Sequence, residues 1–344
     1  MPSLSSASSC PTTRSMRSLP MWGQEDQDLP SGTVLANAYR LSERIGRGAY
    51  GSVYRAEQIS LHRDVAVKVL STSASADPEL AERFVREACA VSRLHHPNTV
   101  TVLDFGRSQC GRLYLVMEYV PGMTLTELVT RAAPLPLAQV VELCVQVAMA
   151  LEAIHAAGII HADLKSENIL CERLTRGELV KVVDFGIARL TEAGVSRVLV
   201  PDPAAPLRSE GAEVGAATIA AHARGTPGYI APEVILGAAP EPASDIYAAG
   251  ILLYFLLTAE LPFGGRHARE VLRRQLDGPV MPPSLQRRDV PESLDALVLR
   301  ATARKPGQRF ADASALRDAL EVVAHELPPT QPSCDRDSGD VIVH

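Results

Sequence analysis

One loop does most to decide the fold of this chain, and its sequence is His161-Ala162-Asp163-Leu164-Lys165-Ser166-Glu167-Asn168. It brings a carboxylate, a cation and a carboxamide close together. Phosphoryl transfer requires an acid–base group for a hydroxyl proton, a positive charge beside the moving phosphoryl group and an oxygen ligand for a metal ion. Asp163, Lys165 and Asn168 could fill these three roles. A stretch this short could also arise by coincidence, so the other motifs of the chain must agree with it.

Length and composition indicate a soluble globular protein. The chain has 344 residues, of which 46% are hydrophobic and 22% are charged, enough for one large domain or two modest ones with a sizeable core. Its net charge of −6 offers no basic excess to neutralise nucleic-acid phosphates. We therefore expect no nucleic acid among its partners.

The cysteines and the apolar segments indicate a cytoplasmic location. The six cysteines are scattered without a CxxC pair, so we expect reduced thiols rather than a zinc site or a disulfide framework. We take the 13-residue segment Tyr247–Ala259 as the longest candidate for a membrane span. A span needs about 20 apolar residues, so we expect a buried helix there and no membrane span.

The chain divides into segments of different character. Residues 1–36 are rich in Ser, Pro and Thr and are predicted to be disordered. Alternating and β-branched patterns then predict strands at 39–45, 53–57, 64–70, 99–104 and 112–119, with one helix at 78–94. After Pro121 the periodicity favours helices at 137–156, 243–258, 293–303 and 312–324. A long loop is predicted at 191–224 and a polar tail at 327–344.

A glycine-rich motif lies between the first two predicted strands and reads Gly46-Arg47-Gly48-Ala49-Tyr50-Gly51-Ser52-Val53. In a dinucleotide-binding fold such a motif opens a helix, but here a strand follows it. A glycine hairpin lets backbone N–H groups approach phosphates without Cβ clashes. A plain β-turn is the alternative when this motif is taken alone.

Two further motifs would complete a phosphate and metal site. Lys68 lies on an apolar strand, where it could reach nucleotide phosphates if Glu87 on the 78–94 helix orients it. Asp184-Phe185-Gly186 follows the apolar strand 180–183 and places a carboxylate where it could bind Mg²⁺. Late in the chain, Arg309 could pair with Glu233 in the sequence Ala231-Pro232-Glu233.

In this order the motifs resemble those of the protein kinase superfamily, in particular the eukaryotic-like serine/threonine kinases of bacteria. The resemblance covers about Tyr39 to Ala324. It implies an α+β, bilobal fold with a kinase domain at 37–326. Its small β-rich N-lobe, with one main helix, would span 37–120, and its larger, mostly helical C-lobe 121–326.

The resemblance also implies ATP and Mg²⁺ as cofactors, and proteins with Ser or Thr acceptors as partners. The residues implied in nucleotide binding are Ile45, Gly46, Arg47, Gly48, Ala49, Tyr50, Gly51, Val53, Ala66, Lys68, Met117, Glu118, Val120 and Leu170. Asp163, Lys165, Lys68 and Glu87 would be catalytic, and Asn168 and Asp184 would hold the metal. Thr226 would line the acceptor site, and Asp245 resembles the aspartate that braces the catalytic loop.

Two residues of the catalytic loop depart from the family pattern. Ala162 replaces the arginine that usually holds a phosphorylated activation-loop residue. We therefore hypothesise that activity does not depend strongly on phosphorylation of Ser196, Ser209 or Thr218. Ser166 replaces a common proline, which we expect to be tolerated.

The alternative function is a pseudokinase that acts as a scaffold or binding module. Pseudokinases typically lack one or more of the catalytic residues. This chain has Lys68, Glu87, Asp163, Asn168 and Asp184. The complete set favours an active kinase.

Overall fold

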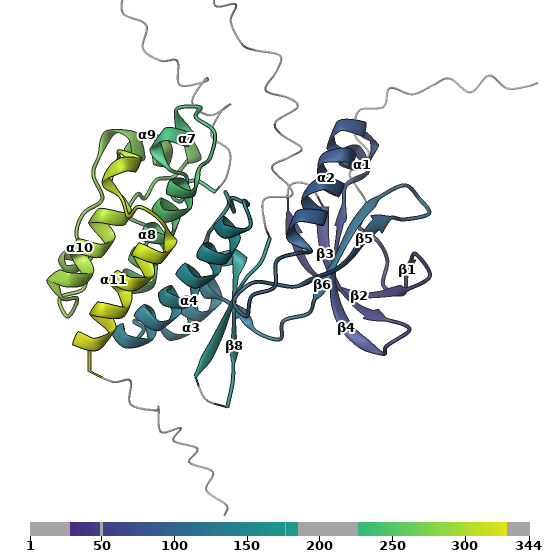
Figure 1. Cartoon of the computed structure of the whole chain (residues 1–344), viewed down its shortest axis with the longest axis horizontal. Coiled ribbons are helices and arrows are strands. Elements are labelled where there is room, and N and C mark those ends of the chain that lie inside the picture. Colours follow the sequence, from purple (N-terminus) through teal and green to yellow (C-terminus); the bar gives the residue numbers. More distant parts are fainter. Residues whose placement is uncertain (1–27, 49–50, 176, 185–225, 329–344) are drawn as a thin grey trace, which may run out of the picture.

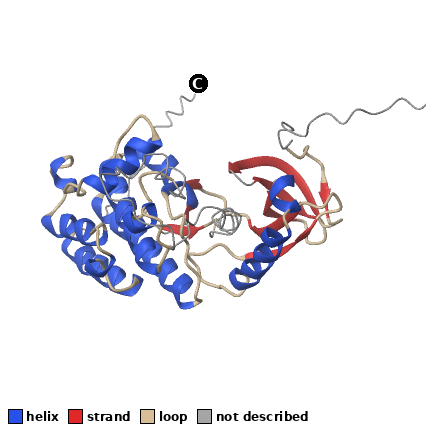
Figure 2. Cartoon of the chain, turned by 90° about the horizontal axis from the view of Figure 1, so that it is seen from above, coloured by secondary structure: helices blue, strands red, loops and turns tan. Residues whose placement is uncertain are grey.

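The computed structural model describes residues 28–48, 51–175, 177–184 and 226–328. They form a small lobe of strands and a larger lobe of helices (Figure 1). Seen from above, most strands lie in one lobe and most helices in the other (Figure 2). This arrangement confirms the predicted bilobal α+β fold.

The N-lobe is built on one antiparallel sheet with the strand order β1-β2-β3-β4-β6-β5. Its strands are β1 (Val34–Leu35), β2 (Tyr39–Gly48), β3 (Gly51–Gln58), β4 (Arg63–Leu70), β5 (Val102–Arg107) and β6 (Leu113–Glu118). Two helices belong to this lobe, α1 (Thr72–Ala76) and α2 (Pro78–Val91). The predicted helix at 78–94 is confirmed as α2 but ends earlier, and the five-residue α1 was not predicted.

Strand alternation divides the residues of β4 between two cores. Val65, Val67 and Val69 pack into an outer core on one face of the sheet. Ala66, on the opposite face, belongs to the main core that reaches into the C-lobe. Lys68 has the same parity as Ala66, so its side chain points toward the other lobe.

The predicted disorder of residues 1–36 is wrong for residues 28–36. Gly32 N donates a hydrogen bond to Leu41 O, and Leu41 N donates to Thr33 O. Val34–Leu35 form β1, whose Leu35 is buried in the outer core. A short segment with one well-placed leucine therefore folds onto the sheet despite its polar composition. Residues 1–27 lie outside the described part of the chain.

The C-lobe is mostly helical. Its helices are α3 (Leu125–Ala132), α4 (Leu137–Ala156), α7 (Pro232–Ile235), α8 (Pro242–Thr258), α9 (Ala268–Asp277), α10 (Glu292–Ala301) and α11 (Ala313–Glu326). The C-lobe also has a small sheet of β7 (Met123–Thr124), β8 (Ile169–Arg173) and β9 (Glu178–Val182). Strand β8 begins directly after Asn168, and β9 ends shortly before Asp184. The predicted loop 191–224 and residues 329–344 of the predicted tail lie outside the described residues.

Among the described residues, helix α4, and not the Tyr247–Ala259 segment, is long and apolar enough to cross a membrane. It is 20 residues long with a mean hydropathy of 1.7, so by length and composition it could cross a membrane, unlike the shorter Tyr247–Ala259 segment. Half of that stretch is buried in the fold, and α4 packs against α8 and α11. The core helix of a folded domain meets the same criterion. The absence of a membrane span therefore stays a prediction.

Helix α8 is the central element of the C-lobe, buried along almost its whole length. At Gly250 a Cβ would lie 2.7 Å from the Ala301 Cβ of α10, so a side chain there would push the two helices apart. This tight packing fixes Asp245, which lies in the first turn of α8 and is only 1% exposed.

An ion pair joins two distant parts of the C-lobe, as the sequence predicts. Arg309 donates from Nη1 and Nη2 to the two carboxylate oxygens of Glu233, at 2.8 and 2.7 Å, and its side chain is fully buried. It also donates to the carbonyl oxygens of Ala243 and Ala303. Burial alone would raise the pKa of Glu233, but the hydrogen bonds and charge of Arg309, together with the other hydrogen bonds to the carboxylate, outweigh burial, and the pKa lies below its usual value.

We predict that Arg309→Ala lowers the free energy of unfolding by about 3–5 kcal/mol, because it leaves the half-buried Glu233 carboxylate without its partner. Urea denaturation measures the change. Arg273→Ala, which breaks the exposed Arg273–Asp277 pair, is the control and should have a much smaller effect. Equal effects of the two variants would contradict the prediction.

Since folding lowers the pKa of Glu233, the ion pair stabilises the fold fully above about pH 4.3 and loses this contribution as the pH falls further.

Candidate active site

A cavity of about 660 Å³ lies between the lobes. Its lining includes every described residue predicted to bind nucleotide or metal, together with Asp163 and Lys165. Ala49 and Tyr50 of the predicted set lie outside the described residues. Glu87, on α2, is not among the lining residues. The structure thus brings together residues far apart in sequence, while their roles stay predictions.

The glycine motif forms a hairpin between β2 and β3, in which Gly46 is paired with Val53 and Gly48 with Gly51. Gly51 has a structural reason to be glycine, because a Cβ there would lie 2.0 Å from the Val69 carbonyl oxygen. Gly46 and Gly48 are not constrained in this way and face the cavity. Their missing side chains leave room for a ligand to approach the backbone.

Lys68 is held by a carboxylate from the other lobe. Its Nζ donates to Asp184 Oδ1 at 2.5 Å, and the Lys68 side chain is only 11% exposed. Burial alone would raise the pKa of Asp184, but the positive charge and hydrogen bond of Lys68 hold it below its usual value. The described contact of Lys68 is thus with Asp184, and a pairing with Glu87 stays a prediction.

Helix α8 anchors the backbone of the catalytic loop through Asp245, as the resemblance implies. Asp245 Oδ2 accepts a hydrogen bond from His161 N at 2.9 Å, and Oδ1 accepts one from Ala162 N at 2.8 Å. Ala162 has a φ of +62°, a left-handed conformation that costs energy for a residue with a Cβ. The two hydrogen bonds hold the backbone in this conformation, which turns the chain toward Asp163.

His161 connects the loop to the strand that carries Asp184. It is fully buried, and its Nε2 donates to Val183 O at 3.1 Å while Nδ1 accepts from Asp163 N at 3.3 Å. This bonding pattern fits a neutral imidazole with its proton on Nε2. Burial lowers the pKa of His161, in keeping with the neutral form.

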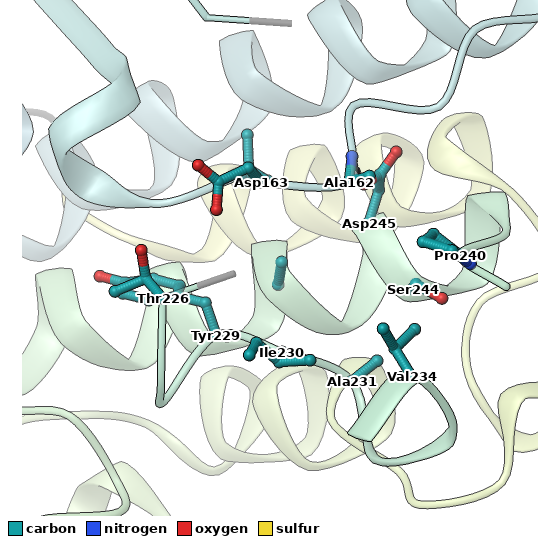
Figure 3. A pocket seen from close by; sticks show the side chains of 12 residues that line it. Ala162, Asp163, Thr226, Tyr229, Ile230, Ala231, Val234, Pro240, Ser244 and Asp245 are labelled. Carbon is teal, nitrogen blue, oxygen red and sulfur yellow. Dashed lines mark hydrogen bonds between the residues drawn. The ribbon is translucent and has the colours of Figure 1, made fainter. Parts of the chain in front are cut away.

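The polar side chains of the loop converge on the Asp163 carboxylate. Asn168 Nδ2 donates to Asp163 Oδ2 at 3.1 Å, and Lys165 Nζ lies 3.2 Å from the same oxygen. Lys165 Nζ also donates to Thr226 Oγ1 at 2.7 Å. Figure 3 shows Asp163 and Thr226 on facing sides of a small pocket next to this site. A hydroxyl placed between Asp163 and Thr226 would contact both the Asp163 carboxylate, which is a base, and the Lys165 ammonium group.

The site contains oxygen donors suited to a divalent cation. Asn168 and Asp184 both line the cavity, and the Val183 N–H donates to Asn168 O at 2.9 Å, so the two residues lie on adjoining backbone segments. Asn168 uses Nδ2 toward Asp163, which leaves Oδ1 as its ligand atom. A carboxylate and an amide oxygen fit Mg²⁺, which prefers oxygen ligands.

Two contacts near the site were missed from the sequence. Ser166 is buried, and its Oγ lies 3.0 Å from Tyr229 Oη and accepts from Thr126 Oγ1 at 2.7 Å, so it forms bonds that a proline could not. Asp28 bonds to Arg44 of β2 and to Ser52 of β3, so it bridges the two strands of the glycine hairpin. The only signal for Ser166 was its departure from the family pattern, and Asp28 gave none.

Comparison with known proteins agrees with this geometry. The model of the protein kinase domain family matches residues 39–326. Serine/threonine-protein kinase pkn3 of Myxococcus xanthus is 39% identical over 88% of this chain, and PknB of Mycobacterium leprae is 36% identical over 87%. The matches cover 52% and 45% of those relatives, so this chain spans about half their length.

Solved structures show the same architecture. The kinase domain of Mycobacterium tuberculosis PknI, 28% identical, superposes with a TM-score of 0.64 over 87% of this chain and the whole of that domain. Rad53 in complex with AMP-PNP, 25% identical, gives a TM-score of 0.64 over 82% of this chain and 64% of that one. Sequence, fold and site therefore agree that the chain belongs to the protein kinase family.

Proposed function

We propose that this chain is a serine/threonine protein kinase that transfers the γ-phosphoryl group of ATP to Ser and Thr hydroxyls of proteins, itself included, in bacterial signalling. One observation carries the proposal: Lys68, Asp163, Lys165, Asn168 and Asp184 line a single cavity below a glycine hairpin. The serine/threonine kinases among its relatives, and the ATP analogue in the Rad53 complex, support the choice of reaction and nucleotide.

Each residue of the site has a part in this reaction. Lys68 would bind the nucleotide phosphates, and the carboxylate of Asp163 would orient the acceptor hydroxyl and take its proton. Lys165, which bridges Asp163 and Thr226, would stabilise charge on the transferring phosphoryl group. Since little covalent chemistry falls to the protein, position and charge do most of the work.

We propose Mg²⁺ as the metal, with Asn168 and Asp184 as its ligands. When bound, Mg²⁺ would neutralise charge on the phosphate oxygens. In the structure Lys68 occupies one oxygen of the Asp184 carboxylate. When Asp184 holds the metal, it would either release Lys68 or keep this contact while Lys68 also contacts the nucleotide. A cytoplasmic location belongs to the same proposal, and the four described cysteines, all free thiols, support a reducing compartment.

We predict that purified protein with Mg²⁺ and labelled ATP phosphorylates itself or casein, and that Asp163→Asn lowers kcat by about 10²–10⁴-fold. The amide keeps the shape of the carboxylate but cannot accept the proton, so ATP affinity should change little. Asp318→Asn, on the exposed face of α11, is the control and should match the wild type. A wild type without any transfer would favour the scaffold function instead.

We also predict that Lys68→Met lowers both ATP affinity and kcat, because it removes the cation that meets the phosphates and frees Asp184. Isothermal titration with ATP and Mg²⁺ measures the affinity, and the labelled-ATP assay measures the rate. Normal transfer by Lys68→Met would contradict the assignment of this lysine.

A third prediction concerns the loop residues Ser196, Ser209 and Thr218. We expect their joint replacement by Ala to leave the initial rate within about a factor of five, because Ala162 cannot form the charge-assisted bonds that an arginine gives to a phosphate. Rates are compared after phosphatase treatment of both proteins. A much larger loss would show that phosphorylation of this loop is required.

A further inference from the structure

The segment Thr226–Ala231 faces Asp163 across the small pocket (Figure 3) and is hydrogen-bonded from two sides. On one side Ser166 of the catalytic loop meets Tyr229 Oη at 3.0 Å. On the other side Gln275 of α9 meets the backbone of Gly228 and Ile230. Apart from Lys165, the described groups that hold the segment by side-chain hydrogen bonds are uncharged.

Gln275 is only 1% exposed, and its carboxamide bonds mainly to this segment, with one longer contact of 3.5 Å from Nε2 to Tyr247 Oη. Oε1 accepts from Gly228 N at 3.1 Å, while Nε2 donates to Gly228 O at 2.9 Å and to Ile230 O at 3.0 Å. Gly228 has a φ of +105°, so the backbone bends sharply at the residue that Gln275 holds. Buried backbone groups need such partners, because an unsatisfied one is costly.

Ser166 completes a chain of hydroxyl groups. Thr126 Oγ1 of α3 donates to Ser166 Oγ at 2.7 Å, and Ser166 Oγ meets Tyr229 Oη. Ser166 is 2% exposed and Tyr229 is 6% exposed, so water hardly competes for these bonds. The catalytic loop and the segment Thr226–Ala231 are therefore fixed relative to one another next to Asp163.

We propose that Gln275 and Ser166 are positioning residues for the phosphoryl acceptor, which act by holding Thr226–Ala231 in place against Asp163 and Lys165. This proposal rests on the proposed kinase function. A protein acceptor must bring its hydroxyl to Asp163 past Thr226, so a displaced segment would misplace the hydroxyl. Of this segment only Thr226 also lines the nucleotide cavity, so the other residues of that cavity would keep their places. The two residues thus control use of the acceptor rather than of ATP.

The test measures kcat/KM for the acceptor and KM for ATP separately. The acceptor is the peptide that the wild type phosphorylates best in a degenerate serine/threonine peptide array. For Gln275→Met we expect kcat/KM for the peptide to fall at least about tenfold, with KM for ATP within about twofold. Gln146→Met is the matched control. Gln146 likewise bonds through its carboxamide to backbone groups, Glu178 O and Val180 N, but these belong to β9 and not to the segment Thr226–Ala231.

A second arm removes the Ser166–Tyr229 bond from either side without opening a large cavity; Ser166→Ala removes the Thr126 bond as well. Ser166→Ala and Tyr229→Phe should each lower kcat/KM for the peptide about fivefold, and the double variant should be no worse than Ser166→Ala. Thermal unfolding records the stability of each variant.

The proposal is overturned if kcat/KM for the peptide is unchanged in folded variants, if KM for ATP rises equally, or if Gln146→Met has the same effect as Gln275→Met. Fully additive effects of Ser166→Ala and Tyr229→Phe would also contradict it. Failure of the kinase function itself looks different, because the wild type would then transfer no phosphoryl group to any acceptor.

Discussion

The carboxylate of Asp245 is the constraint on which the active site depends. It is buried in the first turn of α8, and it accepts hydrogen bonds from the backbone N–H groups of His161 and Ala162. Without it, the left-handed conformation of Ala162 would have no compensation, and Asp163 would lose its fixed direction. The apolar packing of α8 thus determines the geometry of a polar loop, because a helix buried on all sides cannot shift.

The two lobes contribute different parts of the site and share the main hydrophobic core. The sheet supplies Lys68 and the glycine hairpin, and the C-lobe supplies Asp163, Lys165 and Asn168. The Lys68–Asp184 bond and the Val100 N–H bond to Val182 O join the two. Under the proposed function, the nucleotide would lie in the cavity between these two groups of residues.

The sequence predicts the parts of this structure that follow from periodicity and from motif order. Periodicity predicts α4 with its observed bounds, and motif order pairs Arg309 with Glu233, as the structure does. The bonds of Gln275 and Ser166 could not be predicted, because they depend on how α9 and the catalytic loop pack against one segment. The place of Leu35 cannot be predicted because one buried side chain in a polar stretch gives no periodic pattern. The bonds of the exposed Asp28 depend on the folded hairpin. The sequence gives no warning that α4 is the longer apolar candidate, because Gln and Glu residues interrupt its apolar residues.

The placement of Asp28 and β1 has a practical consequence for work with this protein. The family match begins at Tyr39, and an expression clone trimmed to that boundary would remove both β1 and the carboxylate that joins Arg44 to Ser52. The hairpin would remain in the trimmed product, but its two strands would lose the Asp28 hydrogen bonds that join Arg44 to Ser52. Nucleotide affinities measured on such a fragment would then describe a looser hairpin than the one in the whole chain.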